Sequence, residues 1–121
     1  MSEKYPATHA RMIERSLTEN LYVSSIVLFE LEYGNAKSLF TKKSALRLKR
    51  FLQEPIAMLD FKHEDAEAAG RIRASLEARK EPIGPYDTLI AGQAVARGFT
   101  IVTTNYREFS RVDGLLWEDW S

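Results

Sequence analysis

An aspartate at the start of an apolar helix is the first candidate for chemistry in this chain. Asp87 follows a loop, residues 82–86, in which two prolines and a glycine restrict the backbone, and it precedes the apolar segment 88–92. The backbone N–H groups at a helix N-terminus stabilise a carboxylate and still leave it able to face a ligand. Two interpretations follow: Asp87 caps the helix, or it binds a metal ion.

Two further polar residues stand where a binding site is expected. Glu30 lies in an apolar helical stretch, residues 26–33, which predicts that this acid faces inward. Burial of a charge is costly unless the charge is paired or binds a cation. The alternative is a solvated acid, because glutamate is a common helix former. Asn105 follows the strongest predicted strand, a position where asparagine is most often a turn residue.

The elements that must position these residues alternate along the chain. Short apolar runs predict strands at about residues 21–24, 56–59, 99–103 and 115–117. Helical spacing of apolar residues predicts helices at about residues 7–19, 26–33, 36–52, 64–79 and 87–97. We expect Gly34 to end or kink the second helix and Gly98 to close the last one.

This alternation favours a parallel sheet covered by helices on both faces, the doubly wound α/β class. Ligands of such sheets bind at the carboxyl ends of the strands. We therefore expect Glu30, Asp87 and Asn105 at one edge of the sheet. Magnesium prefers oxygen ligands, uses one or two carboxylates directly and recruits substrate phosphate. A phosphodiester nuclease, in which the metal activates a water molecule, fits these residues.

Composition excludes several classes of function. The 121 residues include no cysteine, so disulfides and thiolate catalysis are excluded, and 17 basic residues balance 17 acidic ones. The balanced charge means that any attraction to nucleic acid must be local. No apolar run reaches the length of a membrane span, which is roughly 18 residues or more. We expect a soluble, cytoplasmic protein with one domain over residues 1–121.

Two local features each allow two interpretations. A basic run either grips RNA phosphates or forms a solvated helix face. Its members are Lys37, Lys42, Lys43, Arg47, Lys49 and Arg50. Trp117 and Trp120 lie in an apolar terminal stretch, which favours core or interface anchors over platforms for stacking bases.

Four segments in order resemble the PIN-domain ribonuclease toxins of the VapC type. They are residues 24–34, 82–92, 101–109 and 112–120. The resemblance implies a PIN-like three-layer α/β/α fold with a parallel sheet of about four short strands. It also implies a magnesium-dependent endoribonuclease, with manganese as an alternative metal. Glu30 and Asp87 match the metal-binding acids of the family, and Asn105 falls at a catalytic position where many members have a further acid.

The resemblance implies partners as well. It predicts a VapB-type antitoxin, a homodimer, operator DNA bound only through the antitoxin complex, and an RNA substrate, with transfer RNA and particularly the initiator preferred. No membrane association is expected. Family members usually open with a strand ending in Leu-Asp-Thr-Asn, and no such segment occurs here. This difference predicts weak or absent nuclease activity and leaves an alternative open, a catalytically defective module that binds antitoxin or dimerises.

Overall fold

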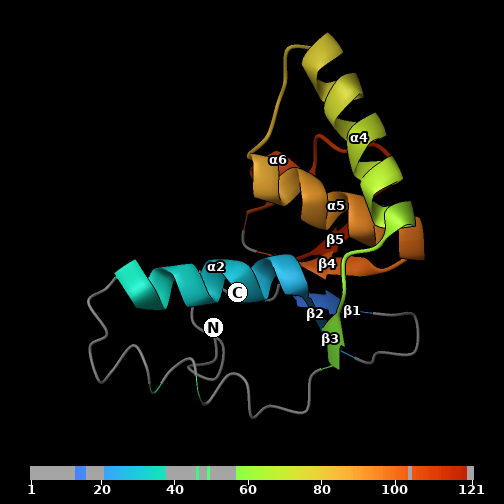
Figure 1. Cartoon of the computed structure of the whole chain (residues 1–121). Helices are drawn as coiled ribbons and strands as arrows, with labels where there is room; N and C mark the ends of the chain where they lie inside the picture. Colours follow the sequence, from blue (N-terminus) through green and yellow to red (C-terminus); the bar gives the residue numbers. More distant parts are fainter. Residues whose placement is uncertain are drawn as a thin grey trace.

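The structure is a computed structural model that describes residues 13–15, 21–37, 46, 49, 57–103 and 105–119 (Figure 1). Its strands are β1 (Ile13–Arg15), β2 (Leu21–Ser24), β3 (Ala57–Leu59), β4 (Thr100–Val102) and β5 (Leu116–Glu118). Its helices are α2 (Ser25–Lys37), α4 (His63–Ala78), α5 (Pro85–Arg97) and α6 (Tyr106–Phe109). The helix predicted at residues 36–52 lies mostly outside the described residues, as does Trp120.

The strands form one sheet in the order β3-β2-β1-β4-β5. The pairs β2–β3 and β4–β5 are parallel, as the alternating pattern predicts, and the α/β class is confirmed. The central strand β1 runs antiparallel to both of its neighbours. The prediction of a helix at residues 7–19 is therefore wrong at Ile13–Arg15. Pairing with β2 on one side and β4 on the other satisfies backbone groups on both neighbours, and this outweighs the local helical spacing.

Helix α5 begins and ends as its sequence predicts. Gly84 is the N-cap and Pro85 takes the first helical position, where its missing N–H costs nothing. At the other end Gly98 adopts a left-handed conformation with φ 68°, and its N–H bonds back to the carbonyls of the last turn. The helix is thus fixed at both ends, and its first turn has a defined position.

Helices α4 and α5 pack tightly against one another (Figure 1). A Cβ atom built on Gly92 of α5 would lie 2.6 Å from the backbone N and Cα of Ala69 on α4. Only glycine allows this approach. Helix α2, in contrast, continues through Gly34 to Lys37, so Gly34 does not end this helix, and the alternative that it kinks the helix stays a prediction.

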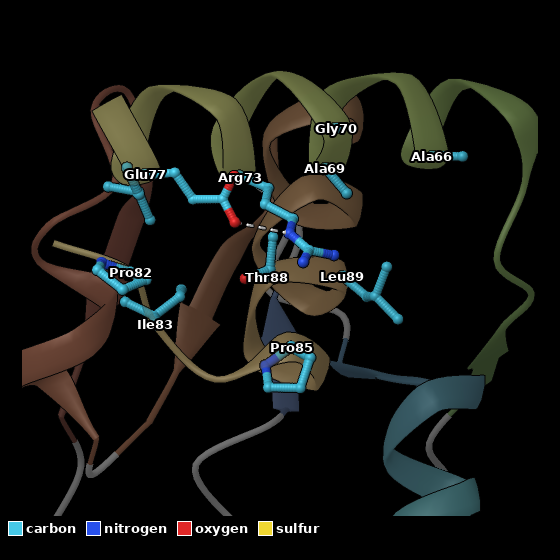
Figure 2. Close-up of a pocket in the computed structure, with 11 residues that line it drawn as sticks. Ala66, Ala69, Gly70, Arg73, Glu77, Pro82, Ile83, Pro85, Thr88 and Leu89 are labelled. Carbon is cyan, nitrogen blue, oxygen red and sulfur yellow. Dashed lines mark hydrogen bonds and ion pairs between the residues drawn. The ribbon is translucent and has the colours of Figure 1, made fainter. Parts of the chain in front are cut away.

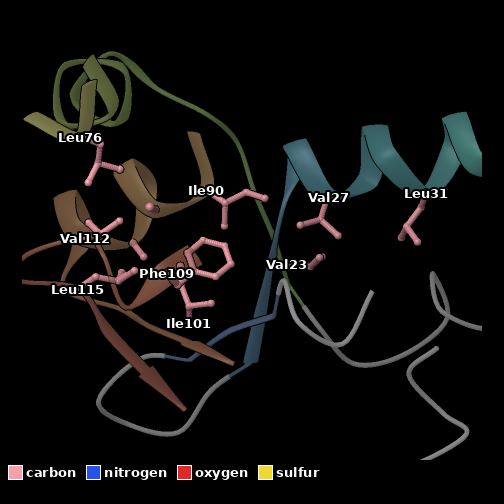
Figure 3. Close-up of a cluster of buried hydrophobic side chains, with 11 residues drawn as sticks. Val23, Val27, Leu31, Leu76, Ile90, Ile101, Phe109, Val112 and Leu115 are labelled. Carbon is pink, nitrogen blue, oxygen red and sulfur yellow. The ribbon is translucent and has the colours of Figure 1, made fainter. Parts of the chain in front are cut away.

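The apolar core joins the sheet to the helices (Figure 3). Ile90 of α5, Ile101 of β4 and Phe109 of α6 are fully buried together, and Val23 and Val27 extend the same cluster to β2 and α2. Burial of this kind contributes roughly 1.5 to 3 kcal/mol for each large side chain. The core therefore holds the starts of α5 and α6 in fixed places. Among the described residues, no helix is both long and apolar enough to cross a membrane.

Candidate active site

Asp87 lies in the first turn of α5, at the third helical position, and is 8% exposed. The N-cap is Gly84, so the interpretation of Asp87 as the helix cap is wrong. Thr88 anchors the preceding loop, because both its backbone N–H and its hydroxyl donate to the Gly84 carbonyl, at 3.0 and 2.9 Å. The carboxylate of Asp87 is consequently held at the positive end of the helix dipole.

Asn105 connects Asp87 to a second acid. Its side-chain Nδ2 donates to Oδ2 of Asp87 at 3.1 Å and to Oε2 of Glu108 at 3.2 Å. Its backbone N–H donates to the hydroxyl of Thr103, directly after β4, at 2.8 Å. Asn105 is thus more than a turn residue, since its amide holds two carboxylates side by side. We call Asp87, Asn105 and Glu108 the acid cluster.

Glu108 is the site residue that the sequence analysis missed. It lies on α6, three residues after Asn105, and residues at this spacing face the same side of a helix. Its Oε2 also lies 3.5 Å from the backbone N of Gly84. A Cβ atom on Gly84 would lie 3.7 Å from Oδ2 of Asp87 and 3.8 Å from Oε2 of Glu108. The loop before α5 therefore passes directly alongside both carboxylates.

The two carboxyl groups of the acid cluster act on each other. The pKa of Glu108 is lowered, and the largest cause is a hydrogen bond from the Asp87 side chain. Burial raises this pKa, whereas the Gly84 N–H, the Asn105 amide and the charge of Arg111 lower it further. A hydrogen bond between two carboxyl groups requires that one of them carries a proton. Two like charges at this distance do not both ionise easily, unless a cation lies between them. The cluster thus favours either one shared proton or one bound cation.

Glu30 lies on the neighbouring helix α2. It is half-buried, and its Oε1 atom is buried. The ring of the preceding residue, Phe29, contacts the ring of Tyr86, which precedes Asp87. The structure therefore joins Asp87 and Asn105 in one hydrogen-bonded cluster and places Glu30 on the adjacent element. Within the described part of the chain, no group of three or more His, Cys, Asp or Glu side chains is arranged to hold a metal ion.

The donor set of the acid cluster fits magnesium in the way that phosphate-processing enzymes use it. Magnesium binds through one or two carboxylates, retains several water molecules and takes further oxygen ligands from substrate phosphate. Asp87 and Glu108 supply two carboxylates whose Oδ2 and Oε2 atoms share one amide donor. Asn105 can also offer its own amide oxygen. The residues thus suit an open cation site better than a closed cage of protein ligands.

A pocket of about 440 Å³ lies behind the loop, between α4 and the start of α5 (Figure 2). Its lining is mostly apolar and includes Ala69, Leu76 and Ile83. At its wall, Arg73 and Glu77 form an ion pair at 3.2 Å between Nε and Oε2. The pocket therefore offers neither an unpaired acid nor a cluster of bases, and the chemistry belongs to the acid cluster.

A second buried aspartate lies on the same pair of helices. Asp65 of α4 is 1% exposed and pairs with Arg97 near the end of α5, at 2.7 Å between Oδ2 and Nη2. Burial raises the pKa of Asp65, but the hydrogen bond from Arg97, the Lys62 N–H and the guanidinium charge lower it more, and the net shift is downward. This aspartate already has its cation within the protein.

Comparisons with known proteins identify the family of this chain. Residues 2–115 match the family model of the PIN domain. The chain is 42% identical over 103 residues to "tRNA(fMet)-specific endonuclease VapC" of Salmonella typhimurium. This match covers 85% of this chain and 77% of that protein. It is 36% identical over 118 residues to "Ribonuclease VapC2" of Rickettsia felis, and this match covers 97% of this chain and 87% of that protein.

The fold agrees as well. A crystal structure of VapBC2 from Rickettsia felis bound to a promoter DNA fragment superposes with a TM-score of 0.76 at 38% identity, over 83% of this chain and 74% of that one. The chain therefore belongs to the PIN-domain family, among the VapC-type ribonucleases. This result confirms the family resemblance and the PIN-like α/β fold expected from the sequence. The site residues themselves remain predictions that these comparisons do not test.

Proposed function

We propose that this chain is a magnesium-dependent endoribonuclease, the toxin of a toxin–antitoxin pair, which cleaves transfer RNA and is neutralised by a VapB-type antitoxin. The observation that carries the proposal is the acid cluster, two carboxylates held together by one amide at the start of α5. The ribonuclease relatives support the reaction class. The similarity to a DNA-bound VapBC complex supports an antitoxin partner and operator binding through that complex.

The residues divide the work of phosphodiester hydrolysis. A water molecule gives up a proton as its oxygen forms a bond to phosphorus, the bond from phosphorus to the leaving ribose oxygen breaks, and the leaving oxygen takes up a proton. Asp87 and Glu108 would hold Mg²⁺, or Mn²⁺ in its place, with Glu30 as a further oxygen ligand from α2. A bound Mg²⁺ supplies a water molecule of lowered pKa and neutralises charge on the phosphate. Asn105 would orient both carboxylates through its amide, which is uncharged.

The preferred substrate is transfer RNA, with the initiator as the best candidate. The name of the Salmonella relative, a tRNA(fMet)-specific endonuclease, supports this choice at 42% identity. We further propose that the toxin forms a homodimer and acts in the cytoplasm.

A cleavage assay with a matched control tests the function. Initiator and elongator methionine transfer RNAs are incubated with the wild type, Asp87→Asn and Asp113→Asn, with Mg²⁺ or with EDTA. Asp113 is a suitable control because it is an acid whose side chain is 89% exposed. It pairs with Arg79, which is not a member of the acid cluster. We expect Mg²⁺-dependent cleavage of the initiator, unchanged in Asp113→Asn.

In Asp87→Asn the rate should fall by about 100-fold or more, the size typical of losing one group that stabilises transition-state charge. Equal cleavage by the wild type and Asp87→Asn would refute the assigned site. Absence of Mg²⁺-dependent cleavage in the wild type would instead favour the alternative, a catalytically defective module that binds an antitoxin or dimerises. Equal cleavage of both transfer RNAs would refute only the initiator preference.

A further inference from the structure

Three exposed aromatic rings form a continuous strip next to the acid cluster. Tyr86 is 44% exposed, Phe29 is 50% exposed and Tyr33 is 56% exposed. The ring centroids of Phe29 and Tyr86 lie 5.4 Å apart, and those of Phe29 and Tyr33 lie 6.5 Å apart with nearly parallel planes. We call these three residues the aromatic strip. It begins at the residue directly before Asp87 and continues along α2.

A positive charge lies at the far end of the strip. Phe29, Tyr33 and Lys37 follow one another at intervals of four residues, so they share one face of α2. The Lys37 ammonium lies 5.8 Å from the centroid of the Tyr33 ring, within the range of a cation–π contact. The strip therefore connects a candidate cation site at one end to a basic group at the other.

Exposed rings in mutual contact indicate a binding surface. Single exposed apolar residues are ordinary, but adjacent aromatic rings keep a large apolar area in water, which is removed when a ligand covers it. Surfaces that hold single-stranded nucleic acid combine aromatic faces for the bases with basic groups for the backbone. Phe29, Tyr33 and Lys37 have this combination, and Tyr86 connects it to the acid cluster.

We propose that the aromatic strip is a stacking surface for the bases of single-stranded RNA beside the scissile phosphate, and that Lys37 contacts a phosphate further along the strand. This inference rests on the proposed ribonuclease function, because it places the cleaved phosphate at the acid cluster. Stacking uses the π-face that every base has, so the strip holds the strand with little preference for sequence. Choice of the cleavage site then belongs to other parts of the RNA or protein.

Binding without cleavage tests the proposal. Fluorescence anisotropy in EDTA compares a short fluorescein-labelled oligouridine with an abasic ribose-phosphate chain of the same length and label. The full-length protein should bind oligouridine about tenfold more tightly than the abasic chain, since only oligouridine has bases that can stack on the rings. Equal affinities for the two probes would overturn the proposal.

Substitutions at Phe29 separate stacking from general apolar contact. Phe29→Leu retains apolar area but has no ring, whereas Phe29→Trp retains a ring. We expect the preference for oligouridine to fall about tenfold in Phe29→Leu and in Tyr86→Ala, and to persist in Phe29→Trp. Val95→Ala is a matched control, because Val95 is 37% exposed near the other end of α5, and it should leave the preference unchanged. Phe29→Leu with an undiminished preference would overturn the proposal.

The same measurements distinguish this proposal from the function on which it rests. Base-dependent binding that is lost in Phe29→Leu, in a protein with no Mg²⁺-dependent cleavage, would refute the nuclease and support the strip. Mg²⁺-dependent cleavage with base-independent binding would support the nuclease and overturn the strip. A strip that serves only to dock an antitoxin would also give equal affinities for the two RNA probes, and the RNA proposal would then be wrong.

Discussion

Helices α4 and α5 each present one buried aspartate, and the two have opposite surroundings. Asp65 lies against the guanidinium of Arg97, at 2.7 Å, in an ion pair that ties α4 to the last turn of α5. Asp87, in the first turn of α5, shares the Asn105 amide with a second carboxylate, Glu108. A carboxylate with its cation inside the protein contributes to the fold. In the proposed function, the two carboxylates held side by side would instead bind a cation from solution.

The largest expected effect is on stability, and it should differ between the two aspartates when each is replaced by asparagine. Asp65→Asn removes the charge that Arg97 requires, so it should lower the free energy of unfolding by about 3 kcal/mol, as for other broken buried pairs. Asp87→Asn keeps a side chain that can accept from Asn105 and donate to Glu108, so it should change that free energy by less than about 0.5 kcal/mol. Urea denaturation followed by circular dichroism measures both. Equal losses of stability would show that Asp87, like Asp65, is mainly structural.

Gly92→Ala tests whether close packing of α4 against α5 supports both sites. The new Cβ atom would lie 2.6 Å from the backbone of Ala69, so the helices must move apart. We expect the free energy of unfolding, measured by urea denaturation, to fall by about 1 to 3 kcal/mol. Gly70→Ala is the matched control on α4. No atom lies within 4 Å of its new Cβ, and alanine favours helix, so a gain of about 0.5 to 1 kcal/mol is expected. The same loss in both variants would contradict the packing argument.

The pH dependence of stability should follow the Asp65 ion pair. The pKa of Asp65 in the folded protein is below its ordinary value of 3.8, although burial alone would raise it. The folded state thus holds the ionised form more strongly than the unfolded state does. This contribution is fully present above about pH 4 and is lost as the pH falls through the lowered pKa. The stability difference between wild type and Asp65→Asn should therefore shrink below that pH. A constant difference down to acid pH would contradict the assignment.

The pKa of Glu108 is also lowered, and here the hydrogen bond from Asp87 is the main cause. Its contribution to stability has the same sign, present above the ordinary value of 4.5 and lost as the pH falls through the lowered pKa. The wild type should therefore lose stability relative to Glu108→Gln when acid unfolding is followed in that range. The effect should be smaller than that of Asp65, because no guanidinium pairs directly with the group. A larger effect at Glu108 would reverse the comparison.

Much of this structure is readable from the sequence because the signals are local. Three segments determine their own local conformation: the loop of residues 82–86, the capping glycine Gly98, and the run of residues with high strand propensity before Asn105. These features predicted α5, β4 and the approach of Asp87 to Asn105. Glu108 was missed because its role arises from a contact between α6 and the loop before α5, across a separation of 24 residues to Gly84. Its only local signal is the three-residue spacing from Asn105.

The errors have physical causes of the same kind. Ile13 sits in a segment with helical spacing, but its backbone pairs with Val23 of β2 and with Val102 of β4. Such pairing depends on strands that are distant in sequence, so periodicity within the segment cannot reveal it. Gly34 does not end α2, because a glycine without a turn or a positive φ requirement lowers helix stability only modestly. Trp117 is 36% exposed and stacks on Tyr106, so the core alternative is wrong for this residue, whereas its role as an interface anchor stays a prediction.

Magnesium titration tests the central claim most directly, that Asp87 and Glu108 together hold the cation. Isothermal titration calorimetry with Mg²⁺ on the RNA-free protein compares the wild type, Asp87→Asn, Glu108→Gln and the control Asp113→Asn. We expect affinity to fall about tenfold or more in each of the first two variants and to be unchanged in the control. Affinity that is unchanged in both Asp87→Asn and Glu108→Gln would contradict the claim.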